Sequence, residues 1–251
     1  MANILITGAG TGFGRGTAVE LAARGHAVTA ATINAEQATE LAAAQPELTT
    51  MKLDVTDAAD IARVGDLAVD VLVNNAGRGL MAPLTNVPLD EVRKTFDVNV
   101  FGMLAMCQSV IPTMKAQGSG RIINVSSIAG VLAGAMSAPY AMTKHAVEAL
   151  SVSLREELAP HGIDVTKINP GPYLTGFNDR MVDGIDPYLS ADDESAHAAR
   201  DFLKGVMENQ ADPHEIVLAI ADLAEAETTP VETFLPEGIK AMLDEMLAAR
   251  T

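Results

Sequence analysis

The segment from Ala2 to Arg24, ANILITGAGTGFGRGTAVELAAR, decides the fold that this sequence predicts. It begins with an apolar, β-branched run that is typical of a buried strand, and it ends with apolar residues at helical spacing. Between them lie Gly8, Gly12 and Gly14, which let the backbone turn tightly and approach a ligand. The start of the following helix offers unpaired N–H groups and a positive dipole end, which suit a pyrophosphate. The segment predicts a dinucleotide-binding turn, although the same glycines could serve only close packing of the helix on the strand.

The alternation of strand and helix continues along the chain. Strand-like segments are expected at residues 2–7, 26–32, 48–55, 69–75, 120–127, 162–169 and 231–238. Most are continuous apolar runs, which indicates a parallel sheet covered on both faces. The expected fold class is α/β: a Rossmann-type three-layer αβα sandwich with a doubly wound, mostly parallel sheet of about seven strands. We expect a single domain over residues 1–251, in which a segment at about 172–212 forms a substrate loop or lid, or only covers the core.

Composition and charge argue against several classes of protein. The chain of 251 residues has 33 acidic and 17 basic residues, a net charge of −16, and no cluster of Lys and Arg. Such a surface repels nucleic acids and anionic membranes, so neither is expected as a partner. No apolar run reaches the roughly 18–20 residues that span a bilayer, and the start lacks a signal-peptide pattern, so a cytoplasmic location is expected. The five histidines follow no metal-ligand spacing and Cys107 is the single cysteine, so we expect no bound metal and no internal disulfide.

A tyrosine and a lysine stand four residues apart in the stretch PYAMTK, at Tyr140 and Lys144. On a helix these positions share one face, so the phenol and the ammonium can lie side by side. An ammonium about 5 Å away, at an effective dielectric near 20, favours the phenolate by about 3 kcal/mol. That would move the pKa of the phenol from near 10 to about 7–8, where an acid/base catalyst works best. Taken alone, the pair could equally be two neighbours on a solvated helix.

Several further motifs occur along the chain. They are Thr7-Gly8-x-x-x-Gly12-x-Gly14, Asp54, the NNAG stretch Asn74–Gly77, Asn99, Ser127, Tyr140-x-x-x-Lys144, Pro170–Gly171 and Thr175. In type, order and spacing this set resembles the short-chain dehydrogenase/reductase family. The resemblance covers residues 3 to about 175. The segment after Thr175 is variable in this family, so the resemblance implies little about its structure or its role.

The resemblance implies an NAD(P)-dependent oxidoreductase that transfers a hydride between nicotinamide and a secondary alcohol or ketone. Tyr140 would be the general acid/base, Lys144 would also bind the nicotinamide ribose, and Ser127 would hold the substrate oxygen. Asn99 would fix a helix kink and a water that relays protons. Ser126 competes with Ser127, but adjacent strand residues face opposite ways and the family spacing favours Ser127. The residues implied to bind the cofactor are Gly8, Thr11, Gly12, Phe13, Gly14, Thr32, Asp54, Val55, Asn75, Ala76, Gly77, Tyr140, Lys144, Pro170, Gly171 and Thr175.

The choice between NAD and NADP is left open by the residues at the end of the second expected strand. A 2′-phosphate needs a cation or several donors. Thr32 stands at the strand end, where NAD-binding relatives usually carry an Asp, and Ile33 and Thr11 stand where NADP-binding relatives usually carry a basic residue. NAD is slightly favoured.

The substrate is expected to be a small alcohol or ketone of apolar or mixed character. Candidate pocket residues are Leu80, Met81, Leu132, Met136 and Tyr173. The alternative function is a catalytically silent dinucleotide-binding sensor, which loss of the tyrosine or the lysine would have indicated.

The resemblance also implies a homodimer or homotetramer. The family's usual interface uses the two long helices that are expected to start near Leu89 and Pro139. Apolar residues are expected on their outer faces, at Met103, Met106, Cys107, Val110, Val147 and Leu150.

Overall fold

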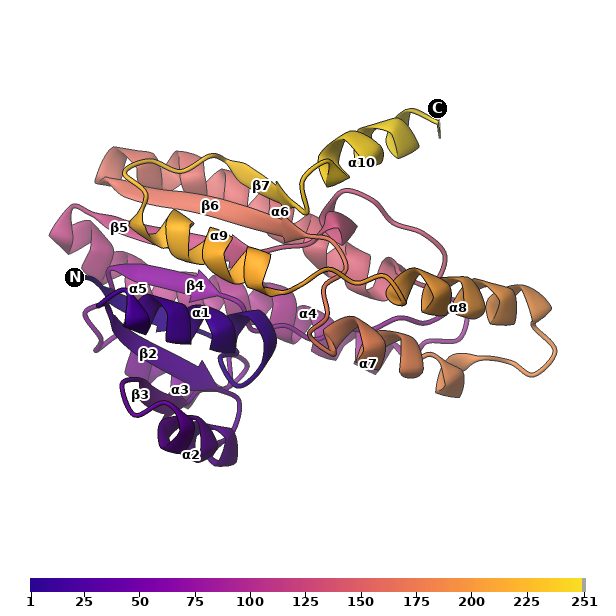
Figure 1. The fold of residues 1–251 in the computed structure, drawn as a ribbon, viewed down its shortest axis with the longest axis horizontal. Helices are drawn as coiled ribbons and strands as arrows, with labels where there is room; N and C mark the ends of the chain where they lie inside the picture. The colour runs from indigo at the N-terminus through magenta and orange to yellow at the C-terminus, as the bar shows by residue number, and fades with distance from the viewer. Residues whose placement is uncertain (250–251) are drawn as a thin grey trace.

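The computed structural model describes residues 1–249 and confirms the predicted fold (Figure 1). Seven strands form one sheet in the order β3-β2-β1-β4-β5-β6-β7. All six pairings between neighbouring strands are parallel. The strands are β1 (Asn3–Ile6), β2 (Ala27–Thr32), β3 (Thr49–Lys52), β4 (Val71–Asn74), β5 (Gly120–Val125), β6 (Ile163–Pro170) and β7 (Glu232–Leu235).

Helices connect these strands. They are α1 (Gly12–Ala23), α2 (Ala35–Ala44), α3 (Ala58–Val64), α4 (Leu89–Phe96), α5 (Met103–Gln117), α6 (Ala138–Leu158), α7 (Phe177–Asp183), α8 (Glu194–Met207), α9 (His214–Glu225) and α10 (Ile239–Ala248). A π-helical turn, η1 (Asp97–Gly102), joins α4 to α5, and 3-10 turns form η2 (Ile128–Gly130), η3 (Ala159–His161) and η4 (Asp186–Tyr188). Polar side chains cap some helix starts; Asp57, for example, accepts hydrogen bonds from the first N–H groups of α3.

The sheet is buried on both faces because successive residues of each strand point to opposite sides. Ile4 and Ile6 of β1 pack in the cluster that holds apolar residues of α1, α2 and α9. Leu5 packs in the other cluster, with apolar residues of α3, α5 and α6. This two-sided burial explains why the strands read as continuous apolar runs.

The order of the strands places a crevice at the carboxyl ends of the central strands, β1 and β4. The chain moves outward from β1 to β2 and β3, then returns to β4 on the other side of β1. Loops that leave the carboxyl ends of β1 and β4 therefore diverge, which is where open α/β sheets bind ligands. Figure 1 shows α7 and α8 extending beyond this end of the sheet.

Most of the apolar residues that were expected on the outer faces of the two long helices are buried inside the chain. Met103, Met106, Cys107, Val110 and Val147 are buried inside the chain. Met106, Cys107 and Val110 pack in the cluster that holds Leu5 of β1, because α5 turns this face inward. The exposed apolar residues of this region are Leu89, Phe101, Met142 and Val152.

No helix among residues 1–249 is both long and apolar enough to cross a bilayer. The same residues contain no group of three or more His, Cys, Asp or Glu side chains arranged to hold a metal ion.

Candidate active site

A cleft opens at the carboxyl ends of the strands. Its floor comes from the turn after β1 and the ends of β3, β4, β5 and β6, and its walls come from α6 and α7. The structure brings most of the predicted site residues to this cleft: Gly8, Thr11, Gly12, Phe13, Asp54, Val55, Asn75, Ala76, Gly77, Ser127, Tyr140, Lys144, Pro170, Gly171 and Thr175. Residues from strands far apart in sequence thus form one concave surface.

The turn after β1 is packed so tightly that only glycine fits at Gly8. This residue has a φ of +65°, and a Cβ placed there would lie 2.8 Å from the Cα of Ala76. Gly14 is equally close, since its Cβ would lie 2.6 Å from the carbonyl oxygen of Gly8. The first turn of α1 therefore lies directly against the glycine turn, with its N–H groups aimed at the cleft.

Hydrogen bonds hold the glycine turn to the end of β4. The Thr7 hydroxyl accepts from the backbone N–H groups of Asn75 and Ala76, each at 3.0 Å. The Asn75 side chain donates to the carbonyl oxygens of Thr7 and Gly8, at 3.0 and 3.1 Å. Within the turn the N–H of Ala9 donates to the carbonyl oxygen of Ala31 at 2.8 Å, while the first N–H groups of α1 have no intrahelical partner and can meet a ligand. A backbone cradle of this kind fits the pyrophosphate of a dinucleotide.

Ser127, Tyr140 and Lys144 lie together at the inner end of the cleft. Ser127 follows β5 and accepts a hydrogen bond from the N–H of Ala129 at 3.1 Å. Tyr140, in the first turn of α6, lies close enough to Ser127 for the Ser127 hydroxyl to lower the pKa of the phenol. Lys144 lies one turn further on, with its Nζ 5.6 Å from the centroid of the Tyr140 ring. The structure therefore places a hydroxyl, a phenol and an ammonium side by side.

Ser126 faces away from this group. Its hydroxyl donates to the carboxylate of Glu148, which also accepts from Asn169 at 2.6 Å and pairs with Lys167 at 2.5 Å. The expected alternation of Ser126 and Ser127 thus matches their contacts, because the Glu148 network occupies Ser126.

The prediction of a low pKa for the Tyr140 phenol is wrong for the protein by itself. Burial raises the pKa of Tyr140 above its usual value of 10, and the neighbouring Ser127 hydroxyl opposes this only partly. The Lys144 ammonium is directed at a backbone group, since Nζ donates to the carbonyl oxygen of Val125 at 2.8 Å. Burial also lowers the pKa of Lys144 to about 8, while the Glu148 carboxylate raises it. At neutral pH the phenol therefore keeps its proton and the lysine keeps its charge.

Three predicted site residues do not line the cleft. Gly14 lies beneath the glycine turn. Thr32 is buried, and its hydroxyl donates to the carbonyl oxygen of Asn34 at 2.9 Å. Asn99 is buried in η1, where its amide nitrogen donates to the carbonyl oxygen of Arg78 at 2.9 Å and to the Thr143 hydroxyl at 3.0 Å.

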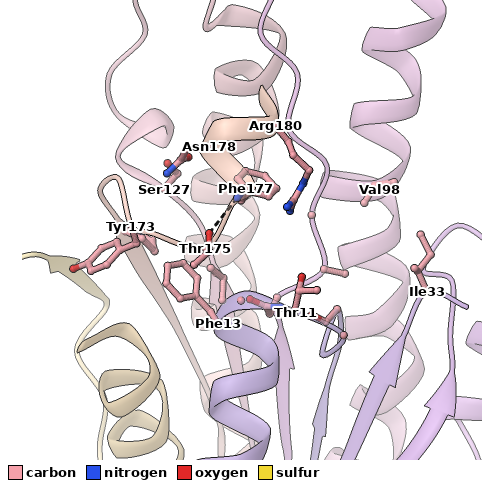
Figure 2. A pocket seen from close by; sticks show the side chains of 18 of the residues that line it. Thr11, Phe13, Ile33, Val98, Ser127, Tyr173, Thr175, Phe177, Asn178 and Arg180 are labelled. Carbon is pink, nitrogen blue, oxygen red and sulfur yellow. Dashed lines mark hydrogen bonds between the residues drawn. The ribbon is translucent and has the colours of Figure 1, made fainter. Parts of the chain in front are cut away.

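The segment after β6 supplies residues that the sequence analysis did not single out as binding residues. Asn178 and Arg180 of α7 line the cleft, as does Gln37 of α2. Figure 2 shows Asn178, Arg180 and Phe177 around the upper part of the cleft, with Thr11 and Phe13 below them. The positions of Phe177, Asn178 and Arg180 depend on how α7 folds back over the sheet, and no local sequence pattern indicates this.

An apolar cluster covers the Tyr140 ring. The buried members of this methionine cluster, besides Tyr140, are Met81, Met136, Met181, Val182, Ile185 and Ala196. Phe177 packs against it, with its ring centroid 5.9 Å from that of Tyr140. Of the other candidate pocket residues, Tyr173 lines the cleft and donates to Glu215 at 2.6 Å, Leu80 is buried, and Leu132 is partly exposed.

Sequence comparison assigns the chain to a family. It matches the family model described as short chain dehydrogenase over residues 2–185. It is 37% identical over 235 residues to the uncharacterized oxidoreductase YusZ of Bacillus subtilis, covering 88% of this chain and 83% of the relative. It is 30% identical over 239 residues to a 3-ketodihydrosphingosine reductase of Bacteroides thetaiotaomicron, covering 92% of this chain and 86% of the relative. The chain belongs to the short-chain dehydrogenase/reductase family, as its motifs predict.

Solved structures agree with this assignment. A short-chain dehydrogenase from Streptomyces avermitilis superposes with a TM-score of 0.85 at 30% identity, over 99% of this chain and 92% of that one. A serine dehydrogenase complexed with NADP+ gives 0.80 at 28% identity, over 93% and 94%. An NAD+-bound xylitol dehydrogenase also gives 0.80 at 28% identity, over 94% and 98%. The protein is thus an oxidoreductase by family, which favours an enzyme over a silent sensor, and neighbours of its fold bind either nicotinamide dinucleotide.

Proposed function

We propose that the protein is a nicotinamide-dependent reductase or dehydrogenase that interconverts a ketone and a secondary alcohol of apolar or mixed character. The observation that carries this proposal is the group formed by Ser127, Tyr140 and Lys144 below a cleft with a glycine cradle. A bound nicotinamide supplies or accepts the hydride. The residues of this chain bind the dinucleotide, orient the substrate and move the proton.

The dinucleotide would lie along the carboxyl ends of the strands. The turn at Gly8 and Gly12 and the start of α1 would hold its pyrophosphate. Asp54, at the end of β3, and the stretch Asn75–Gly77, at the end of β4, line the cleft on either side of the turn, as the family resemblance implies for the adenosine half. Thr175 and the turn at Pro170–Gly171 would border the nicotinamide half.

The proton transfer follows from the protonation state of the site. Ser127 and Tyr140 would both donate hydrogen bonds to the carbonyl oxygen of the substrate, and Tyr140 would give its proton to that oxygen as the carbon is reduced. Burial keeps the phenol protonated at neutral pH, so the site is prepared for the reductive direction. Lys144, charged below about pH 8, stabilises the phenolate that remains. Asn99 would act by tying η1 to Thr143 of α6.

The methionine cluster supports an apolar substrate. Met81, Met136 and Met181 cover the ring of Tyr140, and flexible thioethers adapt to irregular apolar shapes. The segment at about 172–212 would open as a lid, because α7 and α8 bring much of this cover. The ketone in the name of the Bacteroides relative is consistent with this substrate class.

NAD is the favoured cofactor. Ile33, at the end of β2, lines the cleft and is 57% exposed, and the nearby lining residues Thr11 and Gln37 carry no charge. A 2′-phosphate at this place would find hydrogen-bond donors but no adjacent cation.

The proposal is tested by mixing the purified protein with NADH or NADPH and a panel of acyclic, alicyclic and aromatic ketones. Loss of reduced-nicotinamide absorbance is expected with apolar ketones, faster with NADH, and strongly reduced in Ser127→Ala. Tight dinucleotide binding without turnover of any ketone, or of any alcohol in the oxidative direction, would instead support a sensor.

A further inference from the structure

Arg180 is an unexplained cation at the cleft. The charged residues that line the cleft are Asp54, Lys144 and Arg180. Lys144 is buried and donates to the carbonyl oxygen of Val125, and Asp54 accepts from Thr56 at 2.7 Å. Arg180 is exposed, and in Figure 2 its side chain points into the cleft from α7.

The guanidinium of Arg180 lies over the glycine turn. A Cβ at Gly176 would be 3.0 Å from Nη1 of Arg180, so the side chain folds back over the start of α7. One residue earlier, Thr175 faces the turn, since a Cβ at Gly12 would lie 3.4 Å from the Cβ of Thr175. Figure 2 shows the side chain of Arg180 descending from α7 toward Thr11. The guanidinium therefore stands at the mouth of the cradle.

Arg180 has no protein partner among residues 1–249: its side chain makes no ion pair or hydrogen bond there. Two acidic residues lie within one turn of it, but Asp179 accepts from the amide of Gln210 at 2.9 Å, and Asp183 does not pair with it. By contrast, Arg200 of α8 pairs with two carboxylates, at 2.9 and 2.8 Å. In a chain of net charge −16, a guanidinium that faces the cleft without an acidic partner is available to an anion.

We infer that Arg180 binds the pyrophosphate of the dinucleotide from the side opposite the glycine turn. The inference rests on the proposed function, because it requires a dinucleotide in the cradle. The pyrophosphate is the matching anion, since in Figure 2 the guanidinium of Arg180 points toward Thr11 in the glycine turn, whereas Ile33 lies well to the side of it.

The contact would couple dinucleotide binding to closure of the substrate site. Phe177 and Met181, on the same helix as Arg180, pack against Tyr140 or its cluster. A phosphate held by both the turn and Arg180 favours the position of α7 that covers the phenol. Binding of the dinucleotide would then order the substrate pocket.

The test compares Arg180→Ala and Arg180→Lys with wild type by calorimetric titration of NADH, NADPH and ADP-ribose at several salt concentrations. Lys204→Ala is the matched control, because Lys204 is an exposed cation in α8 that does not line the cleft. Loss of one exposed charge-assisted contact should raise Kd about tenfold. The factor should be equal for all three ligands, smaller for Arg180→Lys, and accompanied by a weaker salt dependence. Lys204→Ala should leave Kd nearly unchanged.

The outcomes separate the two proposals. If wild type binds none of the three ligands, the proposed function fails and this inference falls with it. If wild type binds them and Arg180→Ala binds them equally well, only the role of Arg180 is refuted. A loss confined to NADPH would overturn the pyrophosphate assignment and place Arg180 at the 2′-phosphate.

Discussion

Replacing Gly8 by alanine tests whether the glycine turn is the cradle described above. The left-handed backbone of Gly8, at φ +65°, costs an alanine about 1–2 kcal/mol. The new Cβ would also lie 2.8 Å from the Cα of Ala76 and 3.0 Å from its nitrogen, so backbone must move by about 0.6 Å to restore ordinary contact. Such overpacking costs roughly 1–3 kcal/mol more. We therefore expect Gly8→Ala to lose about 2–5 kcal/mol of unfolding free energy.

The matched control is Gly118→Ala. Gly118 has nearly the same backbone, at φ +68°, but nothing lies within 4 Å of its Cβ position. Gly118→Ala should lose only about 1–2 kcal/mol of unfolding free energy, which is the cost of placing an alanine in a left-handed backbone conformation. Urea unfolding followed by circular dichroism gives both values, which suits a chain without Trp. Calorimetry with NADH should show affinity reduced at least about tenfold for Gly8→Ala and unchanged for Gly118→Ala. Equal destabilisation of the two variants, with normal NADH binding by Gly8→Ala, would refute the cradle.

Three further predictions concern the cofactor, the buried lysine and assembly. Ile33→Arg should shift preference toward NADPH by roughly 10- to 150-fold in relative Kd, and wild type that already binds NADPH more tightly than NADH would contradict the reasoning. Burial lowers the pKa of Lys144 from 10.5 to about 8, so between these values the unfolded chain binds more protons and stability from this group increases with pH. Between pH 7 and 10.5, the unfolding free energy of wild type, measured in urea, should therefore increase by up to about 3 kcal/mol relative to that of Lys144→Met. A difference in unfolding free energy that stays constant over this range would argue against a buried ammonium. Light scattering at micromolar concentration should give a dimer or tetramer, with exposed Leu89 and Phe101 candidates for the contact, and a monomeric mass would refute assembly.

The fold was predictable because local patterns determine it. The apolar strands, the glycine turn and the Tyr140–Lys144 spacing all lie in segments where the backbone geometry follows from a few residues. Ser127 could be placed for the same reason, since alternation on a strand end separates it from Ser126.

Other features depend on tertiary packing, which the sequence shows poorly. The phenol of Tyr140 was expected to ionise near neutral pH, but burial under α7 dominates its pKa. Met103 and Met106 were expected on an outer face, yet both are buried, and Met106 packs in the same apolar cluster as Leu5 of β1. Arg180 was not singled out, since it reaches the cleft only through the fold of a segment without a periodic pattern.

The most direct test of the account is the turnover of Tyr140→Phe. The variant keeps the ring that packs against Phe177 and the methionine cluster, and removes only the hydroxyl, whose pKa the neighbouring Ser127 lowers. Dinucleotide affinity measured by calorimetry should stay within about twofold of wild type. The value of kcat, measured on the best ketone, should fall about 10²- to 10⁴-fold, the usual contribution of a positioned acid. A kcat above roughly one tenth of wild type would show that Tyr140 is not the proton donor.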